Sequence, residues 1–208
     1  MDVVVAGGHG QIGLRLLRLL ADGGHRTRGL VRNPDHAQDL ADVGAEAVVC
    51  DMEALDDLSG CCQGADAVVF AAGAGPGSGP ERKQTVDLGA AVKLMEAGVH
   101  RYVMVSAISA GRPGDWSEPM RPYYEAKAGA DERLMASGLD YTIVRPGGLT
   151  EDPGTGLVAV GTELGYANIP RDDVAAVLLA VLGTPSSIGK TFELVSGDTA
   201  IEDAVANL

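Results

Sequence analysis

Residues 3–13 read VVVAGGHGQIG. The continuous apolar run at the start of this stretch predicts a buried parallel strand, and the glycines that follow predict a tight turn. Gly7, Gly10 and Gly13 form the pattern G-x-x-G-x-x-G. The first glycine lets the chain turn, the second lets the backbone approach a pyrophosphate, and the third lets a helix pack closely on the strand. We therefore expect a strand, a phosphate-binding loop and the beginning of a helix.

The loop is expected to hold a dinucleotide through its backbone. Backbone N–H groups and the positive end of the helix dipole would face the phosphates. The cofactor-binding residues predicted here are Gly7, Gly8, His9, Gly10, Gln11 and Ile12.

Strand-length apolar runs alternate with helical patterns along the rest of the chain, which predicts a parallel sheet with helices on both faces. We expect strands at residues 3–6, 27–31, 47–50, 67–70, 102–106, 141–144 and 191–195. We expect helices at residues 11–21, 34–40, 53–58, 81–97, 122–137 and 171–182. Turn-forming residues concentrate in two further segments, 73–80 and 147–169. The sequence thus predicts one Rossmann-type, doubly wound α/β domain over residues 1–208, with residues 147–169 as a small loop or hairpin region on the substrate side.

Composition limits the classes of partner. The chain has 208 residues, 46% of them hydrophobic, and a formal net charge of −13. This charge argues against nucleic acids and anionic membranes, which attract Lys and Arg. No apolar run reaches the roughly 18 residues of a membrane span, and the amino terminus has no secretory pattern. We expect a cytoplasmic monomer or homodimer that acts on a small molecule and binds neither nucleic acid nor membrane.

The cysteines offer no metal site. Cys50, Cys61 and Cys62 lack the C-x-x-C and Cys/His spacings of metal centres. Adjacent cysteines are poorly arranged for a structural bridge, so we expect three reduced thiols that pack as small apolar side chains.

The end of the second predicted strand bears on the choice of dinucleotide. An NAD-selective site usually places Asp or Glu here to bond the ribose 2′-hydroxyl. The sequence instead has Arg32 and Asn33, and Arg32 lies nineteen residues after Gly13. A guanidinium can pair with a 2′-phosphate, so we expect NADP(H) rather than NAD(H). The alternative is that Arg32 is an ordinary solvated charge.

Asp51 and Met52 follow the third predicted strand and are expected to lie near the adenine. Asp51 can bond the adenine amino group or cap the amino terminus of the next helix, and the sequence leaves both roles open.

Tyr123 and Lys127 form a Y-x-x-x-K motif. Four residues span about one helical turn, so both side chains share a face, and Pro122 is typical of a helix start. A nearby ammonium lowers the pKa of a phenol, and such a tyrosine can donate a proton to a carbonyl oxygen as hydride reaches the carbon. Ser106 or Ser109 would hold the substrate oxygen, with Ser106 nearer the end of the fifth strand. The alternative for the motif is a surface i,i+4 pair.

Taken together, these motifs resemble the short-chain dehydrogenase/reductase superfamily, and most closely its atypical branch of small NAD(P)-binding, NmrA-like and epimerase-like proteins. The stretch LDYTIVRPGGLT at residues 139–150 is the most specific part of this resemblance. The resemblance implies the strand order 3-2-1-4-5-6-7. It also implies that Lys127 holds the nicotinamide ribose and that Tyr123 is the general acid/base.

The resemblance implies two further contacts with the cofactor. Residues Ala71, Ala72 and Gly73 would line the adenine-ribose side, and the backbone of Pro146, Gly147, Gly148 and Leu149 would contact the nicotinamide end. The sequence departs from the family pattern at His9, where threonine or serine is frequent, and at Ala107, where many relatives have serine.

Three functions are compatible with these residues. The leading hypothesis is an NADP(H)-dependent oxidoreductase that transfers hydride to a small carbonyl, quinone or flavin-like acceptor, with Tyr123, Lys127 and Ser106 as catalytic residues. The second is a non-catalytic NADP(H) sensor of NmrA-like type, which has no need of the Tyr/Lys pair. The third is an epimerase or isomerase that recycles bound NAD, and the short stretch after Pro146 leaves little room for the substrate domain it usually needs.

Overall fold

A mixed nine-stranded sheet forms the centre of the protein in a computed structural model that describes residues 1–75 and 77–208. Pro76, inside the turn-rich segment expected at residues 73–80, lies outside the described residues. The sheet order is β11-β8-β10-β6-β5-β4-β1-β2-β3.

Seven parallel strands make up most of this sheet. They are β1 (Asp2–Ala6), β2 (Arg26–Val31), β3 (Glu46–Val49), β4 (Ala67–Phe70), β5 (Arg101–Val105), β6 (Asp140–Pro146) and β10 (Lys190–Ser196). The predicted order 3-2-1-4-5-6-7 is confirmed, with β10 as the seventh strand.

The segment between β6 and α7 differs from its prediction. Strands β7 (Gly148–Thr150) and β9 (Asn168–Pro170) pair in parallel, so they are not the two arms of a hairpin. Strand β8 (Leu157–Gly161) joins the main sheet antiparallel to β10, and β11 (Thr199–Ala200) extends that edge. Gly and other turn-forming residues surround these short strands, so the sequence favoured a loop or hairpin here.

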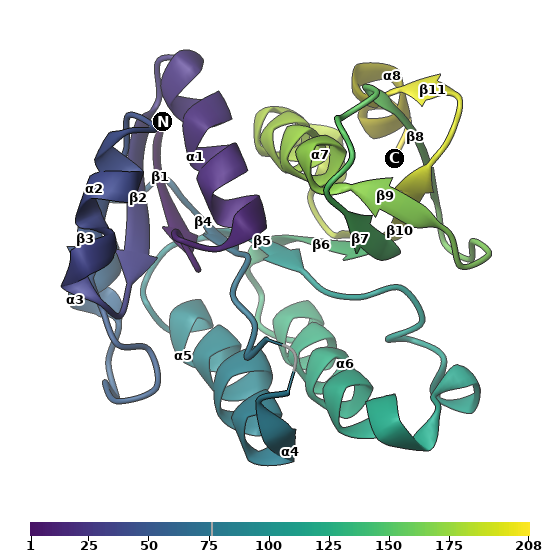
Figure 1. Ribbon diagram of the computed structural model, residues 1–208, viewed down its shortest axis with the longest axis horizontal. Helices are drawn as coiled ribbons and strands as arrows, with labels where there is room; N and C mark the ends of the chain where they lie inside the picture. The colour runs from purple at the N-terminus through teal and green to yellow at the C-terminus, as the bar shows by residue number, and fades with distance from the viewer. Residues whose placement is uncertain (76) are drawn as a thin grey trace.

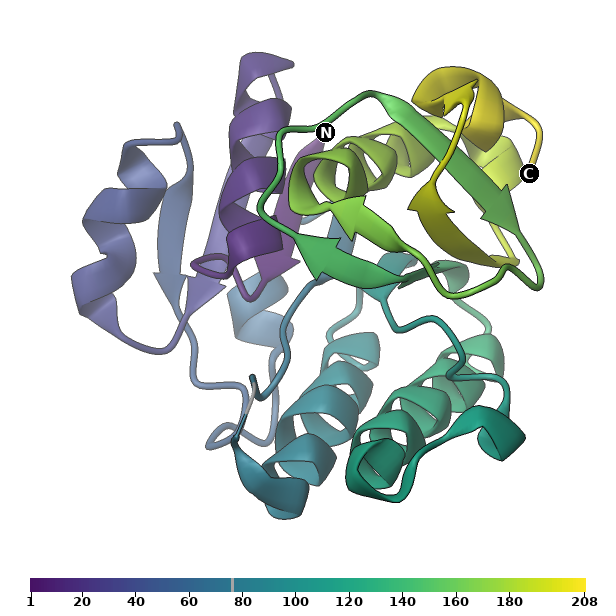
Figure 2. The same ribbon diagram turned by 45° about the vertical axis from the view of Figure 1, so that its right-hand side comes forward.

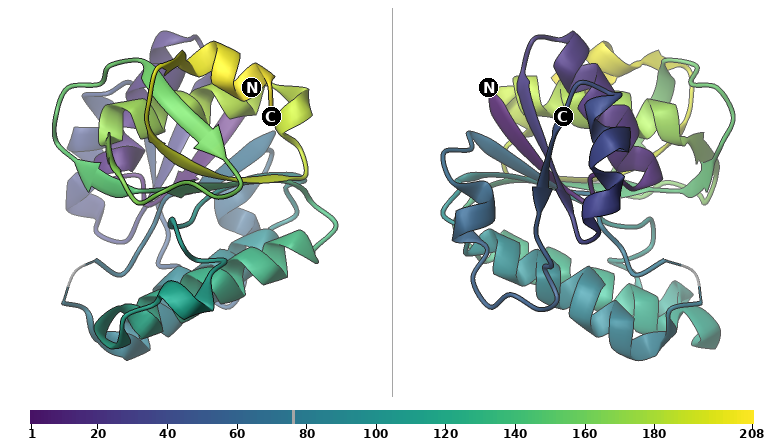
Figure 3. Two further views of the ribbon diagram at one scale, coloured as in Figure 1. Left: turned by 90° about the vertical axis from the view of Figure 1, so that its right-hand side faces the viewer. Right: turned by 60° about the vertical axis from the view of Figure 1, so that its left-hand side comes forward.

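Helices cover both faces of the sheet (Figure 1). One face carries α1 (Gln11–Asp22), α7 (Arg171–Gly183) and α8 (Ile201–Ala206), with α2 (Ala37–Ala41) beside α1. The other face carries α5 (Ala91–Met95) and α6 (Arg121–Met135), which run side by side in all the views (Figures 2 and 3). No helix in the described part of the chain is long and apolar enough to cross a membrane.

The core is divided by the sheet. Val3 and Val5 of β1 pack with the α1–α7 side, whereas Val4 and Ala6 pack with the α5–α6 side. All four side chains are fully buried, which explains why the first strand reads as a continuous apolar run rather than an alternating one.

The long helix expected at residues 81–97 is interrupted by a wide turn. It consists of α4 (Gly79–Arg82), the π-helical segment Lys83–Ala90 and α5. A π-helical segment rotates the residues that follow it relative to an α-helix, and such segments are frequent at functional sites. Here it contains Asp87, whose contacts are described below.

The prediction of a helix at residues 53–58 is wrong. The carbonyl groups of Glu53 and Leu55 accept hydrogen bonds from the Lys93 ammonium rather than from a following helical turn. The helix in this region is α3 (Ser59–Cys62), where Asp57 accepts hydrogen bonds from the backbone and hydroxyl of Ser59.

The expectation of three reduced thiols is also wrong. Cys50 and Cys61 form a disulfide with a Cα–Cα distance of 6.4 Å, and it ties the end of β3 to α3. Cys62 is free and buried, and burial raises the pKa of its thiol to about 11. The prediction failed because the neighbours Cys61 and Cys62 have different surroundings: one meets Cys50 and the other enters the core.

The short 3₁₀ turns lie in the connections, at Pro34–His36, Pro113–Asp115, Glu118–Met120 and Pro185–Ser187.

Candidate functional site

A cavity of about 390 Å³ opens at the carboxyl ends of strands β1 to β4. Ligands of doubly wound sheets bind at this edge. The predicted cofactor residues that line the cavity are Gly7, His9, Gly10, Arg32, Asn33, Asp51, Met52, Ala71, Ala72 and Gly73. The predicted residues Gly8, Gln11, Ile12, Lys127, Pro146, Gly147, Gly148 and Leu149 do not line it. The structure therefore gathers ten of the predicted cofactor residues, from the ends of four strands, into one cavity.

The glycine loop fits a pyrophosphate. Gly7 has a φ of 82°, and a Cβ there would lie 2.8 Å from the backbone of Ala72. Gly10 donates a hydrogen bond to the Gly7 carbonyl at 2.8 Å and precedes α1 without any side-chain cap. The first-turn N–H groups of α1 therefore donate to no N-cap side chain, and their bond to a phosphate stays a prediction.

Gly8 packs directly against the second strand. A Cβ on Gly8 would lie 2.7 Å from Cα of Gly29, and the Gly8 N–H donates to the Leu30 carbonyl at 3.2 Å. Gly8 therefore acts by bringing the loop against β2, which accounts for its position outside the cavity lining.

His9 lines the cavity, and its ring contacts Asp39 and His36, which follow β2 in the chain. Its Nε2 lies 2.7 Å from the Asp39 carboxylate, and its ring stacks on His36 with centroids 3.6 Å apart. His36 also lines the cavity and was missed by the sequence analysis. At position 9, where threonine or serine is frequent in the resembled family, this chain therefore has an imidazole that stacks on a second one.

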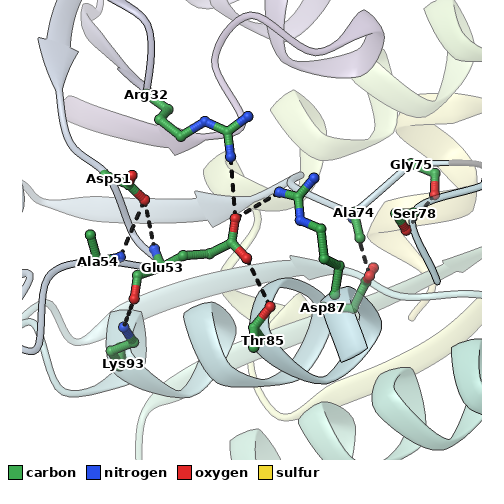
Figure 4. Close-up of polar contacts among 11 residues, drawn as sticks. Arg32, Asp51, Glu53, Ala54, Ala74, Gly75, Ser78, Thr85, Asp87 and Lys93 are labelled. Carbon is green, nitrogen blue, oxygen red and sulfur yellow. Dashed lines mark hydrogen bonds and ion pairs between the residues drawn. The ribbon is translucent and has the colours of Figure 1, made fainter. Parts of the chain in front are cut away.

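Arg32 has an acidic neighbour that the sequence did not reveal. Its Nη1 donates to Oε2 of Glu53 at 3.3 Å (Figure 4), and Arg82 donates to the same oxygen. Glu53 and Arg82 both line the cavity. They follow β3 and lie in α4 respectively, so no local pattern around the second strand could have indicated them.

Asn33 and Asp51 each close a turn. The Asn33 side chain accepts a hydrogen bond from the Asp35 N–H at 3.0 Å. Oδ1 of Asp51 accepts from the N–H groups of Glu53 and Ala54, at 3.0 and 3.3 Å. Asp51 therefore caps a turn rather than a helix, and its bond to adenine stays a prediction.

Tyr123 and Lys127 lie on α6, and Lys127 is buried at the end of β5. The Lys127 ammonium donates to the Val105 carbonyl at 3.1 Å and lies 3.3 Å from Asp87. It lies 6.0 Å from the centroid of the Tyr123 ring. Lys127 is therefore part of a buried polar network with the half-buried Tyr123 beside it, which argues against the alternative of a surface pair.

The expectation that Lys127 lowers the phenol pKa is wrong. Burial raises the pKa of Tyr123 above its ordinary value, and the Asp87 carboxylate raises it further. The charge of Lys127 is already balanced by Asp87, so little of it acts on the phenol. Tyr123 is consequently a protonated phenol at neutral pH, and it can donate a proton.

Asp87 is a site residue that the sequence analysis missed. One carboxylate oxygen pairs with Lys127, and the other accepts from the Ala74 N–H at 3.1 Å, just after the cofactor-lining residues 71–73 (Figure 4). Asp87 is only 1% exposed. A single acid between Val86 and Leu88, in an otherwise apolar stretch of helix, was the available signal.

The two candidate serines differ in their surroundings. Ser106 is buried, and its Oγ has no hydrogen-bond partner within the described residues. Ser109 has a φ of 67°, a sparsely populated conformation for a residue with a side chain, and its Oγ accepts a hydrogen bond from Arg112 at 3.0 Å. The Ser106 hydroxyl makes no hydrogen bond of ordinary geometry within the described residues, which favours it as the group that holds a substrate oxygen. The buried Asp131 carboxylate competes for this hydroxyl, because burial raises the pKa of Asp131 and the interaction with Ser106 lowers it.

Glu193, a buried acid in the middle of β10, holds three segments together. It pairs with Arg112 and accepts hydrogen bonds from the N–H groups of Ser109 at 3.2 Å and Leu164 at 2.6 Å. Strained conformations such as that of Ser109 persist only where surrounding contacts enforce them. Glu193 supplies such contacts, and a charge between Phe192 and Leu194 was its signal in the sequence.

The backbone at residues 146–148 is largely engaged within the protein. The Pro146 carbonyl accepts from Ile108, and the N–H groups of Gly147 and Gly148 donate to Leu194 and Ala167. Its contact with a nicotinamide stays a prediction.

Within residues 1–75 and 77–208, no cluster of three or more His, Cys, Asp or Glu side chains could hold a metal ion.

Comparison with known proteins covers the whole chain. The model of an NAD(P)H-binding family matches residues 7–185. The chain is 41% identical over 214 residues to a protein of Bacillus subtilis (strain 168) named as an uncharacterized sugar epimerase, YhfK, with 100% of both chains covered.

Two solved structures agree with this result. A putative NAD-dependent epimerase/dehydratase from Bacillus halodurans superposes with a TM-score of 0.95 at 39% identity, covering 100% of both chains. The oxidoreductase ylbE from Lactococcus lactis superposes with a TM-score of 0.90 at 31% identity, covering 100% of this chain and 96% of that one.

Proposed function

The chain belongs to the NAD(P)H-binding family, and from this premise we propose that it is an NADP(H)-dependent oxidoreductase that reduces a small carbonyl, quinone or flavin-like acceptor. The family membership agrees with the resemblance to epimerase-like short-chain dehydrogenase/reductase proteins. The observation that carries the proposal is the position of Tyr123 beside the buried Asp87–Lys127 pair, because a protein that only binds a dinucleotide has no need of a proton donor there.

Each of these residues has a separate role in the proposed reaction. Tyr123 donates the proton to the substrate oxygen, and its raised pKa keeps that proton in place at neutral pH. Lys127 and Asp87 position the segment around Val105 and Ala74, between which the reacting end of the cofactor would lie. The Ser106 hydroxyl orients the substrate oxygen. NADPH, when bound, supplies the hydride.

The choice of NADP(H) rests on Arg32. Its guanidinium lies on the rim of the cavity that contains the glycine loop, and 61% of its side chain is exposed to solvent. When adenosine is bound in this cavity, Arg32 can therefore donate hydrogen bonds to a phosphate on its 2′-oxygen.

An epimerase is the second candidate. It is favoured by the names of two relatives, a sugar epimerase and a putative epimerase/dehydratase, that align with the full chain at 41% and 39% identity. An epimerase recycles one bound dinucleotide, whereas a reductase exchanges it at every turnover.

The test is to measure binding of NADPH and NADH by cofactor fluorescence, followed by turnover with quinones, flavins and aldehydes. Tight, exchangeable NADPH binding with turnover that is lost in Tyr123→Phe supports the reductase. A protein that purifies with a dinucleotide it does not exchange, and that interconverts sugar epimers without net oxidation, replaces the reductase with the epimerase. NADPH binding without turnover of any acceptor favours a sensor.

As partners we propose only a small-molecule substrate, with the protein acting as a monomer or homodimer. Size-exclusion chromatography with light scattering decides between these two states.

A further inference from the structure

Three side chains from different segments meet at the rim of the cavity. Oε2 of Glu53 accepts hydrogen bonds from Arg32 at 3.3 Å and from Arg82 at 2.6 Å. Oε1 of Glu53 accepts from the Thr85 hydroxyl at 2.8 Å (Figure 4). One carboxylate oxygen therefore occupies the point on which two guanidinium groups converge.

The backbone of Glu53 is fixed, whereas its side chain depends on the arginines. Its N–H donates to Asp51 at 3.0 Å and its carbonyl accepts from Lys93 at 3.1 Å. Among the described residues, the carboxylate accepts hydrogen bonds from the side chains of Arg32, Arg82 and Thr85 and from no backbone group. The carboxylate can thus leave its place by side-chain rotation, with no change in the backbone that lines the cavity.

Both arginines remain open to a ligand. The side chain of Arg82 is 42% exposed and that of Arg32 is 61% exposed, whereas Glu53 is 28% exposed. A phosphate group has three terminal oxygens and can accept from two guanidinium groups at once. The two arginines come from different segments, one after β2 and one in α4, and both already reach the same oxygen of Glu53, so both can reach one phosphate.

We propose that Arg82 is the second guanidinium of the 2′-phosphate site and that Glu53 competes with that phosphate for both arginines. This inference rests on the proposed binding of a dinucleotide in the cavity, but it does not require turnover. Glu53 holds the arginines together when no phosphate is present, and it opposes a dianion that must take the same donors. The balance between the carboxylate and the arginines then sets the preference for NADP(H) over NAD(H).

The competition follows from the donors. A carboxylate and a phosphate both accept from guanidinium N–H groups, and two anions cannot share one convergence point without repulsion. The hydrogen bond from Arg82 lowers the pKa of the Glu53 carboxyl, and burial, which raises this pKa, does not cancel the effect. The competitor is consequently charged at neutral pH.

The test compares two fragments that differ by the 2′-phosphate alone. Calorimetric titration of the full-length protein with adenosine 2′,5′-bisphosphate and with adenosine 5′-monophosphate isolates the contribution of that group. Arg82→Gln is expected to weaken binding of the bisphosphate about tenfold, since a charge-assisted hydrogen bond is lost, and to change binding of the monophosphate less than about twofold. Glu53→Gln is expected to strengthen binding of the bisphosphate about three- to tenfold.

Matched controls come from α6. Glu132→Gln and Arg133→Gln make the same chemical changes at adjacent exposed positions and are expected to leave both affinities unchanged. Thermal melting of each variant confirms that it is folded.

Equal weakening of both fragments by Arg82→Gln overturns the role of Arg82. Weaker binding of the bisphosphate to Glu53→Gln overturns the competition, because Glu53 would then position the arginines. If the wild-type protein binds both fragments but reduces no acceptor, the oxidoreductase proposal is contradicted. The affinities of the variants for the two fragments then still test the roles of Arg82 and Glu53. A wild-type protein that binds neither fragment overturns both proposals.

Discussion

The Lys127 ammonium lies 3.3 Å from the Asp87 carboxylate, and both side chains are buried between α6 and the π-helical segment. A buried pair of this kind is costly to break, because removal of one partner leaves the other charge without compensation. Asp87 also accepts from the Ala74 backbone, so the pair connects the helix bearing Tyr123 with the loop after β4.

Asp87→Asn is expected to lower the free energy of unfolding by about 3 kcal/mol, because the ammonium stays buried without a counter-charge. Lys127→Met is expected to be destabilising for the reciprocal reason. The double variant should lose less than the sum of the two, with a coupling of about 1–3 kcal/mol. Urea unfolding of the four proteins gives this cycle, and additive losses would show that the two charges act independently.

Reduction is expected to continue at alkaline pH. A proton donor works in its protonated form, so its activity falls as the pH rises through its pKa. Because burial and Asp87 raise the pKa of Tyr123 above 10.0, the limiting rate should stay level to about pH 9. A pH profile of kcat for acceptor reduction checks this. A decline centred near neutral pH would mean that the phenol pKa is lowered in the working enzyme.

The thiols are expected to react in three stages. The native protein should give no fast reaction with a thiol reagent at neutral pH, since Cys62 is buried and its pKa is raised to about 11. Unfolding without reductant should expose one thiol, and unfolding with reductant should expose three. Three thiols without reductant would contradict the Cys50–Cys61 disulfide.

Glu193→Gln is expected to destabilise the protein by about 2 kcal/mol and to raise KM for the acceptor more than it lowers kcat. The amide leaves Arg112 without its buried counter-charge and has one acceptor oxygen in place of two, so it cannot accept from both the Ser109 and the Leu164 N–H groups as Glu193 does. Steady-state kinetics and thermal melting measure the two effects. Glu202→Gln, exposed on α8, is the control, and an unchanged KM in Glu193→Gln would remove the acid from any role in shaping the site.

The parallel strands could be predicted because burial on both faces leaves a mark in the sequence. Every one of the seven expected strands is present, since apolar runs such as residues 3–6 and 67–70 need no information about their neighbours. Strand β8 also contains an apolar run, at residues 157–160, but the turn-forming residues around it favoured a loop. Its antiparallel pairing with β10 and the pairing of β11 with β8 join segments that lie far apart in the sequence.

The site residues could be predicted where their pattern lies within a short stretch of sequence. The glycine loop and the Tyr123–Lys127 spacing can be recognised within one strand or one helical turn. Asp87, Glu53 and Glu193 act through partners far along the chain, so their roles became visible only when the fold brought those partners together. A lone charge in an apolar stretch marked two of these acids, but it did not indicate what they would contact.

The direct contact of Gly8 with Gly29 has a consequence for the kinetics of association. Two backbones touch there with no side chain between them, and the Gly8 N–H is bonded to the second strand. The loop therefore has its final shape before any dinucleotide arrives, and little conformational entropy is left to lose at the phosphates. Differences in affinity among dinucleotides should then appear in their rates of release rather than in their rates of capture.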